Sequence, residues 1–164
     1  MDYRSYAPEQ EVTEGIACRR IPNWDGYFDH DEGVPDISAF VPSRRAPARG
    51  LSAYLDRDEA LATLEEHEGF GLVALDIEKM RTETAGRVSV RFTPTSSARS
   101  HVSILGVVDD ELRLILASIS EVVVPPERLP TPPGLKHAHG ARDARGDDLE
   151  ILKAFRARRR GRRR

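Results

Sequence analysis

The sequence predicts a single α+β domain with a mixed or mainly antiparallel sheet and two or three helices. Several short segments alternate apolar and polar residues, which is the period of a half-buried strand. Prolines and glycines separate these segments, and a strong helix-start signal stands between two of them. At 164 residues, the chain is long enough to bury a core without disulfides.

The stretch Arg49–Ile77 organises this prediction. Residues 51–55 (LSAYL) alternate as a strand does. Asp56 and Glu59 form a D-x-x-E variant of the capping box, which predicts that a helix begins there. Gly69 suits the left-handed residue that ends a helix, and the apolar run FGLVALDI then predicts a central strand.

The rest of the chain follows the same logic. One more helical turn is predicted at residues 78–83. Residues 109–120 fit either a helix capped by Asp109 or a hairpin turning at residues 109–110, and the pattern leaves both open. Further strands are predicted at residues 15–21, 87–92, 101–108 and 121–124.

Composition divides the chain into four parts. Residues 1–15 lack periodicity and are expected to be a flexible N-terminal arm, and residues 16–126 form the α+β domain. Residues 127–147 read as a linker rich in proline and glycine, and residues 148–164 as a short helix with an arginine-rich tail.

Charge and cysteine content narrow the classes of function. The formal net charge is −2, yet seven arginines lie within Arg156–Arg164, so the preceding residues are strongly acidic. An acidic body argues against a nucleic-acid groove on the domain itself. The N-terminus is polar and no apolar run has the ~20 residues of a membrane span, which favours a cytoplasmic location. The single cysteine, Cys18, excludes an internal disulfide and is predicted to be structural.

The common catalytic motifs are missing. The sequence contains no GxxxxGK[ST], GxGxxG or GxSxG pattern. His101, in SHVSIL, matches one half of the two-histidine phosphoesterase pattern, but no second half exists, so that class is rejected. No metal site is predicted, because the acidic and histidine residues at positions 30–32 and 67–68 lack ligand spacing.

A set of chemically capable side chains remains, each on or beside a predicted strand. They are Arg19, Arg20, Ser52, Tyr54, His101 and Glu121.

The order of these residues resembles the layout of the ADP-ribosyltransferases: a basic residue on a first strand, a serine on a strand that feeds a helix, and a glutamate before a late valine-rich strand. This resemblance implies NAD as cofactor, bound by Arg19 or Arg20 at the pyrophosphate, with Ser52 and Tyr54 shaping the pocket. Either Glu121 or His101 would assist the transfer. Two features depart from the family: the serine strand reads GLSAYL instead of Ser-Thr-Ser, and EVVVPP lacks a paired Q/E-x-E.

A second resemblance covers more of the chain. It is to a group of small uncharacterised bacterial proteins, and it implies an order of elements without an activity. The pieces that carry it are Arg19-Arg20, Ser38-Ala39-Phe40, Leu51-Ser52, residues 67–72 (HEGFGL) and Ser100-His101-Val102.

The tail supports a hypothesis from another class: a non-catalytic interaction domain, as in bacterial conflict or accessory systems. Arginine-rich ends bind nucleic-acid phosphate by counterion release, and they also bind acidic proteins. The arginines concerned are Arg158, Arg159, Arg160, Arg162, Arg163 and Arg164.

Overall fold

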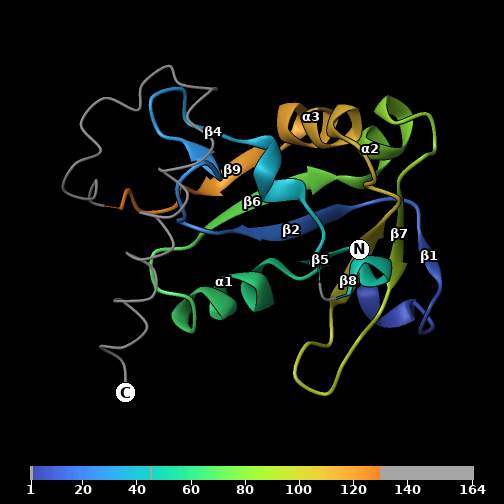
Figure 1. Ribbon diagram of the computed structural model, residues 1–164. Coiled ribbons are helices and arrows are strands. Elements are labelled where there is room, and N and C mark those ends of the chain that lie inside the picture. Colours follow the sequence, from blue (N-terminus) through green and yellow to red (C-terminus); the bar gives the residue numbers. More distant parts are fainter. Residues whose placement is uncertain (1, 45, 130–164) are drawn as a thin grey trace. The chain divides into compact units, whose positions relative to one another are not determined.

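The computed structural model describes residues 2–44 and 46–129 (Figure 1). Within them, seven strands form one sheet: β1 (Glu11–Val12), β2 (Ile16–Ile21), β5 (Leu51–Tyr54), β6 (Gly71–Asp76), β7 (Ser89–Phe92), β8 (His101–Leu105) and β9 (Glu121–Val124). Their order is β1-β7-β8-β5-β2-β6-β9, and each neighbouring pair is antiparallel. A separate hairpin joins β3 (Phe28–Asp29) and β4 (Val34–Pro35). The predicted mainly antiparallel α+β fold is confirmed.

Helices lie on both faces of the sheet. Those of the described residues are α1 (Arg57–Glu65), α2 (Ile77–Glu83) and α3 (Asp110–Ile119), with short 3-10 turns η1 (Tyr3–Ser5), η2 (Ile37–Phe40) and η3 (Pro47–Arg49). Figure 1 shows α2 and α3 on one side of the sheet and α1 on the other.

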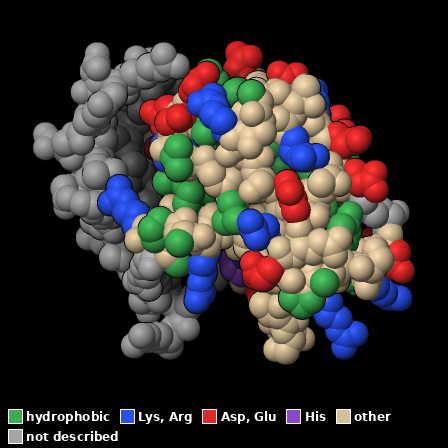
Figure 2. All heavy atoms as spheres, turned by 90° about the vertical axis from the view of Figure 1, so that its right-hand side faces the viewer, with side chains coloured by type: hydrophobic (Ala, Val, Ile, Leu, Met, Phe, Trp, Pro, Cys, Tyr) green, Lys and Arg blue, Asp and Glu red, His purple; other side chains and the backbone are tan. Residues whose placement is uncertain are grey.

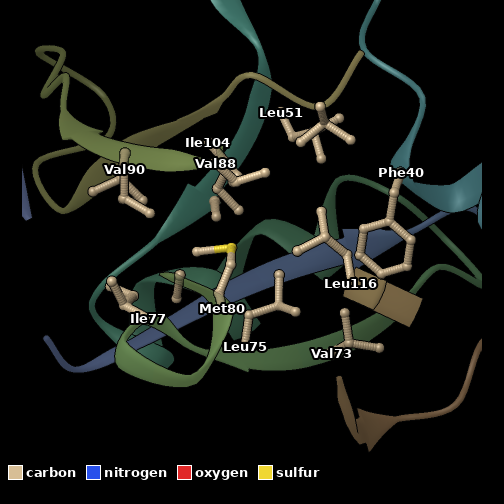
Figure 3. Close-up of a cluster of buried hydrophobic side chains, with 14 of the residues drawn as sticks. Phe40, Leu51, Val73, Leu75, Ile77, Met80, Val88, Val90, Ile104 and Leu116 are labelled. Carbon is tan, nitrogen blue, oxygen red and sulfur yellow. The ribbon is translucent and has the colours of Figure 1, made fainter. Parts of the chain in front are cut away.

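The main core lies between the sheet and the pair α2 and α3. Leu75, Ile77 and Met80 are fully buried there, together with Leu116 of α3 and Phe40 of η2 (Figure 3). Burying one large aliphatic or aromatic side chain stabilises a fold by about 1.5–3 kcal/mol. This face of the sheet is therefore occupied by packing and leaves the opposite face for a site.

Aspartate caps begin the three α-helices. The Asp56 carboxylate accepts hydrogen bonds from the amides of Asp58 and Glu59, at 2.9 and 3.1 Å, and Asp76 caps α2 in the same way. Asp109 accepts from the Leu112 amide at 2.9 Å, so the helix is confirmed over the alternative hairpin. The amphipathic spacing of α3 decides this, because it buries Leu112 and Leu116 on one side.

The N-terminal segment is not the flexible arm that its composition predicted. Residues 11–12 form the edge strand β1, which pairs with β7, and Val12 is fully buried. Tyr3 and Tyr6 pack against the core, and their rings lie 6.5 and 5.9 Å from that of Phe92. The prediction failed because pairing partners 80 residues apart in the chain leave no local periodicity.

The described elements belong to one compact unit, Met1–Arg128. The Glu127 amide bonds to the Gly69 carbonyl at 2.8 Å, and Arg128 pairs with Asp31 at 2.8 Å, so the unit runs two residues past the predicted boundary. Most of the predicted linker, the terminal helix and the arginine-rich tail lie outside the described residues. No helix in the described part is long and apolar enough to cross a membrane.

Candidate functional site

Two rows of polar side chains cross the sheet on its α1 face. Cross-strand partners in an antiparallel sheet point to the same face, and so do residues two apart along one strand. Tyr54 pairs with both Cys18 and His101, and Ser52 pairs with Ser103. The first row is Cys18, Tyr54, His101 and Thr93; the second is Arg20, Ser52, Ser103 and Arg91.

Helix α1 covers only part of this face. It packs on Cys18, Tyr54 and Leu72 through Ala60, and Tyr54 is only 7% exposed. Ser52 is exposed although β5 is the central strand of the sheet. An exposed polar residue at that place means that the sheet is open beside α1. We call this opening, lined by Arg20, Ser52, Tyr54 and His101, the open face.

Arg20 is held at the edge of the open face by the end of α1. Its Nη1 lies 2.8 and 3.1 Å from the two ring nitrogens of His67. His67 Nδ1 also lies 3.0 Å from the Thr63 carbonyl, so the imidazole connects the Arg20 guanidinium to the last turn of α1. A guanidinium has five N–H donors, so Arg20 keeps donors for an anionic ligand.

Arg19 points to the opposite face and contributes no donor to this opening. Its Nε and Nη2 donate to the Ala39 carbonyl at 3.2 and 2.9 Å, and its Nη1 donates to the Ser52 carbonyl at 2.9 Å. Burial, with the neighbouring Arg20, lowers the pKa of Arg19 to about 10, so it stays charged at neutral pH. The structure thus separates the two arginines that the sequence offered together as cofactor ligands.

His101 is fixed in one tautomer. Its Nδ1 lies 3.0 Å from the Thr93 carbonyl and 2.9 Å from Thr93 Oγ1, so Nδ1 carries the proton. Nε2 is then an acceptor, and no residue in the described part of the chain donates to it. Burial lowers the pKa of His101, partly opposed by the Thr93 hydrogen bond and the charge of Glu59. The imidazole is therefore neutral at pH 7 and able to accept a proton.

Two hydroxyls extend the His101 network. Thr93 Oγ1 lies 2.9 Å from Ser103 Oγ, and Ser103 is 8% exposed. When His101 donates to Thr93 Oγ1 and Thr93 donates to Ser103, the Ser103 hydroxyl hydrogen is left for a ligand. The Tyr54 ring meets the His101 ring edge-on at 5.7 Å and restricts its rotation.

Glu59 does not close the capping box predicted for it. Its carboxylate instead accepts the backbone amides of Arg99 and Ser100, at 2.7 and 2.8 Å, and a short hydrogen bond from the Ser100 hydroxyl. These bonds tie α1 to the loop that enters β8 directly before His101. Only the tertiary structure brings that loop to Glu59, 40 residues away in the chain.

Glu121 lies far from the other predicted catalytic residues. It is exposed on the edge strand β9, where it pairs with Ala74. Three strand spacings separate it from β5 and four from β8, or roughly 14 and 19 Å at the usual strand separation. The structure brings Arg20, Ser52, Tyr54 and His101 together and leaves Glu121 outside.

Sequence reasoning missed three residues of the network: Thr93, Ser103 and Glu59. Ser103 stands two residues after His101 on the same strand and so lies on the same face of the sheet. The alternation of the predicted strand was therefore enough to find it. Thr93 and Glu59 gave no such local signal. Cys18, in contrast, fits its structural prediction, since it is 2% exposed and burial raises its thiol pKa.

On the described part of one further face, charged side chains of both signs are mixed (Figure 2). Figure 2, which views the molecule from the right-hand side of Figure 1, shows acidic and basic side chains interspersed and hydrophobic ones in small groups. Comparisons with known proteins add nothing to this geometry: no family model, no curated protein and no solved structure matches the chain.

Proposed function

We propose that the open face binds a nucleotide and that the protein is a small NAD-handling transferase of the ADP-ribosyltransferase type. The observation that carries this proposal is the convergence of Arg20, Ser52 and His101 on one exposed part of a central sheet face. An anion-binding guanidinium and a hydroxyl are two of the three groups that the resemblance implies; the third, the glutamate, lies outside the open face, and the His101 imidazole stands in its place. Their convergence supports the proposal, because the three residues come from three separate strands.

Arg20 would bind the pyrophosphate. Its guanidinium has charged donors left over from its contact with His67, and charge-assisted bonds to phosphate oxygens are among the stronger hydrogen bonds in proteins. His67 fixes the direction of the guanidinium, which reduces the entropy lost on binding.

The carboxamide of nicotinamide would lie at the junction of β2 and β5. Among the described residues the ladder between these strands consists of the pair Cys18 and Tyr54, and Arg20 and Ser52 do not pair with each other. A carboxamide offers one N–H donor edge and one carbonyl acceptor, which are the groups that a strand edge pairs with. The Ser52 hydroxyl stands beside this place and would add a further hydrogen bond.

His101 would take the proton of the acceptor. In the transfer, the acceptor's oxygen or nitrogen forms a bond to the ribose C1′ and the bond from C1′ to nicotinamide breaks, with the electron pair leaving on nicotinamide. The acceptor's proton passes to His101 Nε2, which is unprotonated. Glu121 is too distant for this role, and the Glu59 carboxylate is already bonded to three donors.

Thermal unfolding with NAD tests the proposal. A ligand at a hundredfold excess over its Kd stabilises a protein by about 2.7 kcal/mol, which raises Tm by several degrees. We expect such a rise at millimolar NAD, and a loss of most of it in Arg20→Met, because that variant loses its charged hydrogen bonds.

Arg81→Met is the matched control. Arg81 lies on α2, on the other side of the sheet, and pairs only loosely with Glu11 at 3.8 Å. The control should keep the full NAD response. An unchanged Tm of the wild type in millimolar NAD would overturn the proposal, and so would an equal response in Arg20→Met.

A further inference from the structure

We propose that Arg19 is a strut that keeps β5 apart from β2 and so holds the open face open. The role rests on the proposed function in one respect: it makes Arg19 a positioning residue for the nucleotide site. Arg19 would touch no ligand, and would act through the backbone of Ser52.

The directions of the backbone groups show that the Arg19 guanidinium takes the place of a backbone N–H donor from β2. The Leu55 amide donates to the Ser100 carbonyl on the β8 side. Backbone groups alternate sides along a strand, so the N–H and C=O of Ser52 and Tyr54 face β2. Tyr54 pairs there with Cys18, and Arg20 would be the next partner, opposite Ser52. The Ser52 carbonyl instead accepts from the guanidinium of Arg19, at 2.9 Å.

The other end of the strut is anchored. Nε and Nη2 of Arg19 both donate to the carbonyl of Ala39, which belongs to η2. Ala39 and Phe40 are 1% and 0% exposed, so η2 is fixed in the core. The planar fork of arginine reaches two carbonyls at once with fixed geometry. The distance between β5 and η2 is therefore set by one rigid group.

The consequence is local to the site. Without the guanidinium, the Ser52 carbonyl needs another donor, and the Arg20 amide is the one that the antiparallel ladder would supply. One additional ladder pair would bring the Cα atoms of Arg20 and Ser52 to about 5.5 Å or less. Ser52 would then be less exposed, and the junction at which we place the carboxamide would be closed.

Thiol labelling of Ser52→Cys measures this opening without any ligand. The only native cysteine, Cys18, is 2% exposed and is replaced by alanine in all variants. We compare the rate constant for labelling of the thiolate form, which is obtained from the pH dependence of the labelling rate. This removes any change in the thiol pKa that the loss of the Arg19 charge causes. In the Ser52→Cys background, Arg19→Met should slow labelling about fivefold, the equilibrium factor that one net hydrogen bond gives.

Two further variants keep the test decisive. Arg19→Lys keeps the charge but cannot bridge both carbonyls, and it should label more slowly than the parent; it decides the matter if Arg19→Met does not fold. Arg81→Met should label at the parent rate. A folded Arg19 variant that labels as fast as the parent, or faster, overturns the strut, since mere loosening of the fold would raise the rate.

NAD titration of the wild type and of the single variants Arg19→Met and Arg81→Met, with Ser52 and Cys18 intact, separates the two proposals. Slower labelling in Arg19→Met together with no NAD binding by the wild type would keep the strut and remove the proposed function. NAD binding by the wild type together with unchanged labelling in Arg19→Met would keep the proposed function and remove the strut. If both proposals hold, Arg19→Met should weaken NAD binding while Arg81→Met leaves it unchanged.

Discussion

Removing the Glu59 carboxylate should destabilise the fold and disturb the His101 network together. Glu59 is a half-buried side chain on α1 that binds the loop before β8. Alanine at this position favours the helix, so a loss of stability in Glu59→Ala cannot come from helix propensity.

The size of the effect follows from the donors left behind. Ser100 is fully buried, and its amide and hydroxyl both donate to Glu59. The Arg99 amide is near the surface and can turn to water. Two partly buried bonds to a charged acceptor, each contributing about 1.5–3 kcal/mol, imply a loss of about 3–6 kcal/mol in the free energy of unfolding. Domains of this size have only about 5–15 kcal/mol in total.

Urea unfolding followed by circular dichroism gives this free energy, and the ring signals of His101 in a two-dimensional NMR spectrum report the local change. Glu65→Ala is the control, because Glu65 is exposed in the last turn of the same helix. It should change stability by less than about 0.5 kcal/mol.

The reasoning would be refuted by a Glu59→Ala protein within about 1 kcal/mol of the wild type. Unchanged His101 signals in that variant would show that the loop does not depend on Glu59. The stability of Glu59→Gln should lie between that of the wild type and that of Glu59→Ala. The glutamine keeps one accepting oxygen, but its amide nitrogen would face a backbone N–H donor instead of accepting from it.

Three other predictions concern different parts of the chain. Gly50→Ala should cost at least about 3 kcal/mol in urea unfolding, because Gly50 has φ of 66° and an added Cβ would clash with the Ile104 carbonyl; a stable variant would contradict the turn geometry. The lowered pKa of His101 means that the folded state binds the proton less well than the unfolded state does, so its contribution to stability is present above the unfolded pKa of about 6.5 and is lost as the pH falls below it. His101→Gln should therefore lose less stability than the wild type between pH 7.5 and pH 5, and parallel curves for the two proteins would count against this. Deleting residues 156–164 should weaken retention on a nucleic-acid column and flatten its salt dependence, whereas unchanged retention would exclude the tail as the binding element.

Local patterns account for the parts of the fold that were predicted well. The strand at residues 51–54 and the helix start at Asp56 depend on neighbours within a few positions. Gly69 is left-handed, with φ of 79°, but it does not end the helix as predicted, because α1 already ends at Glu65 and Gly69 lies in the turn that follows. Long-range pairing accounts for the failures: β1 became part of the sheet through β7, and Glu59 found its partners in another loop. Neither contact has a signature in the residues around it.

By itself, the sequence determined the alternation of the strands and hence which side chains share a face. Arg19 and Arg20 had to point to opposite faces, and His101 and Ser103 to the same one, because the period of a strand is two. Only the tertiary structure decided which strands lie next to one another. That order places Arg20, Ser52 and His101 on three adjacent strands and Glu121 at a distant edge, and it depends on pairing between residues far apart in the chain, which local periodicity does not encode.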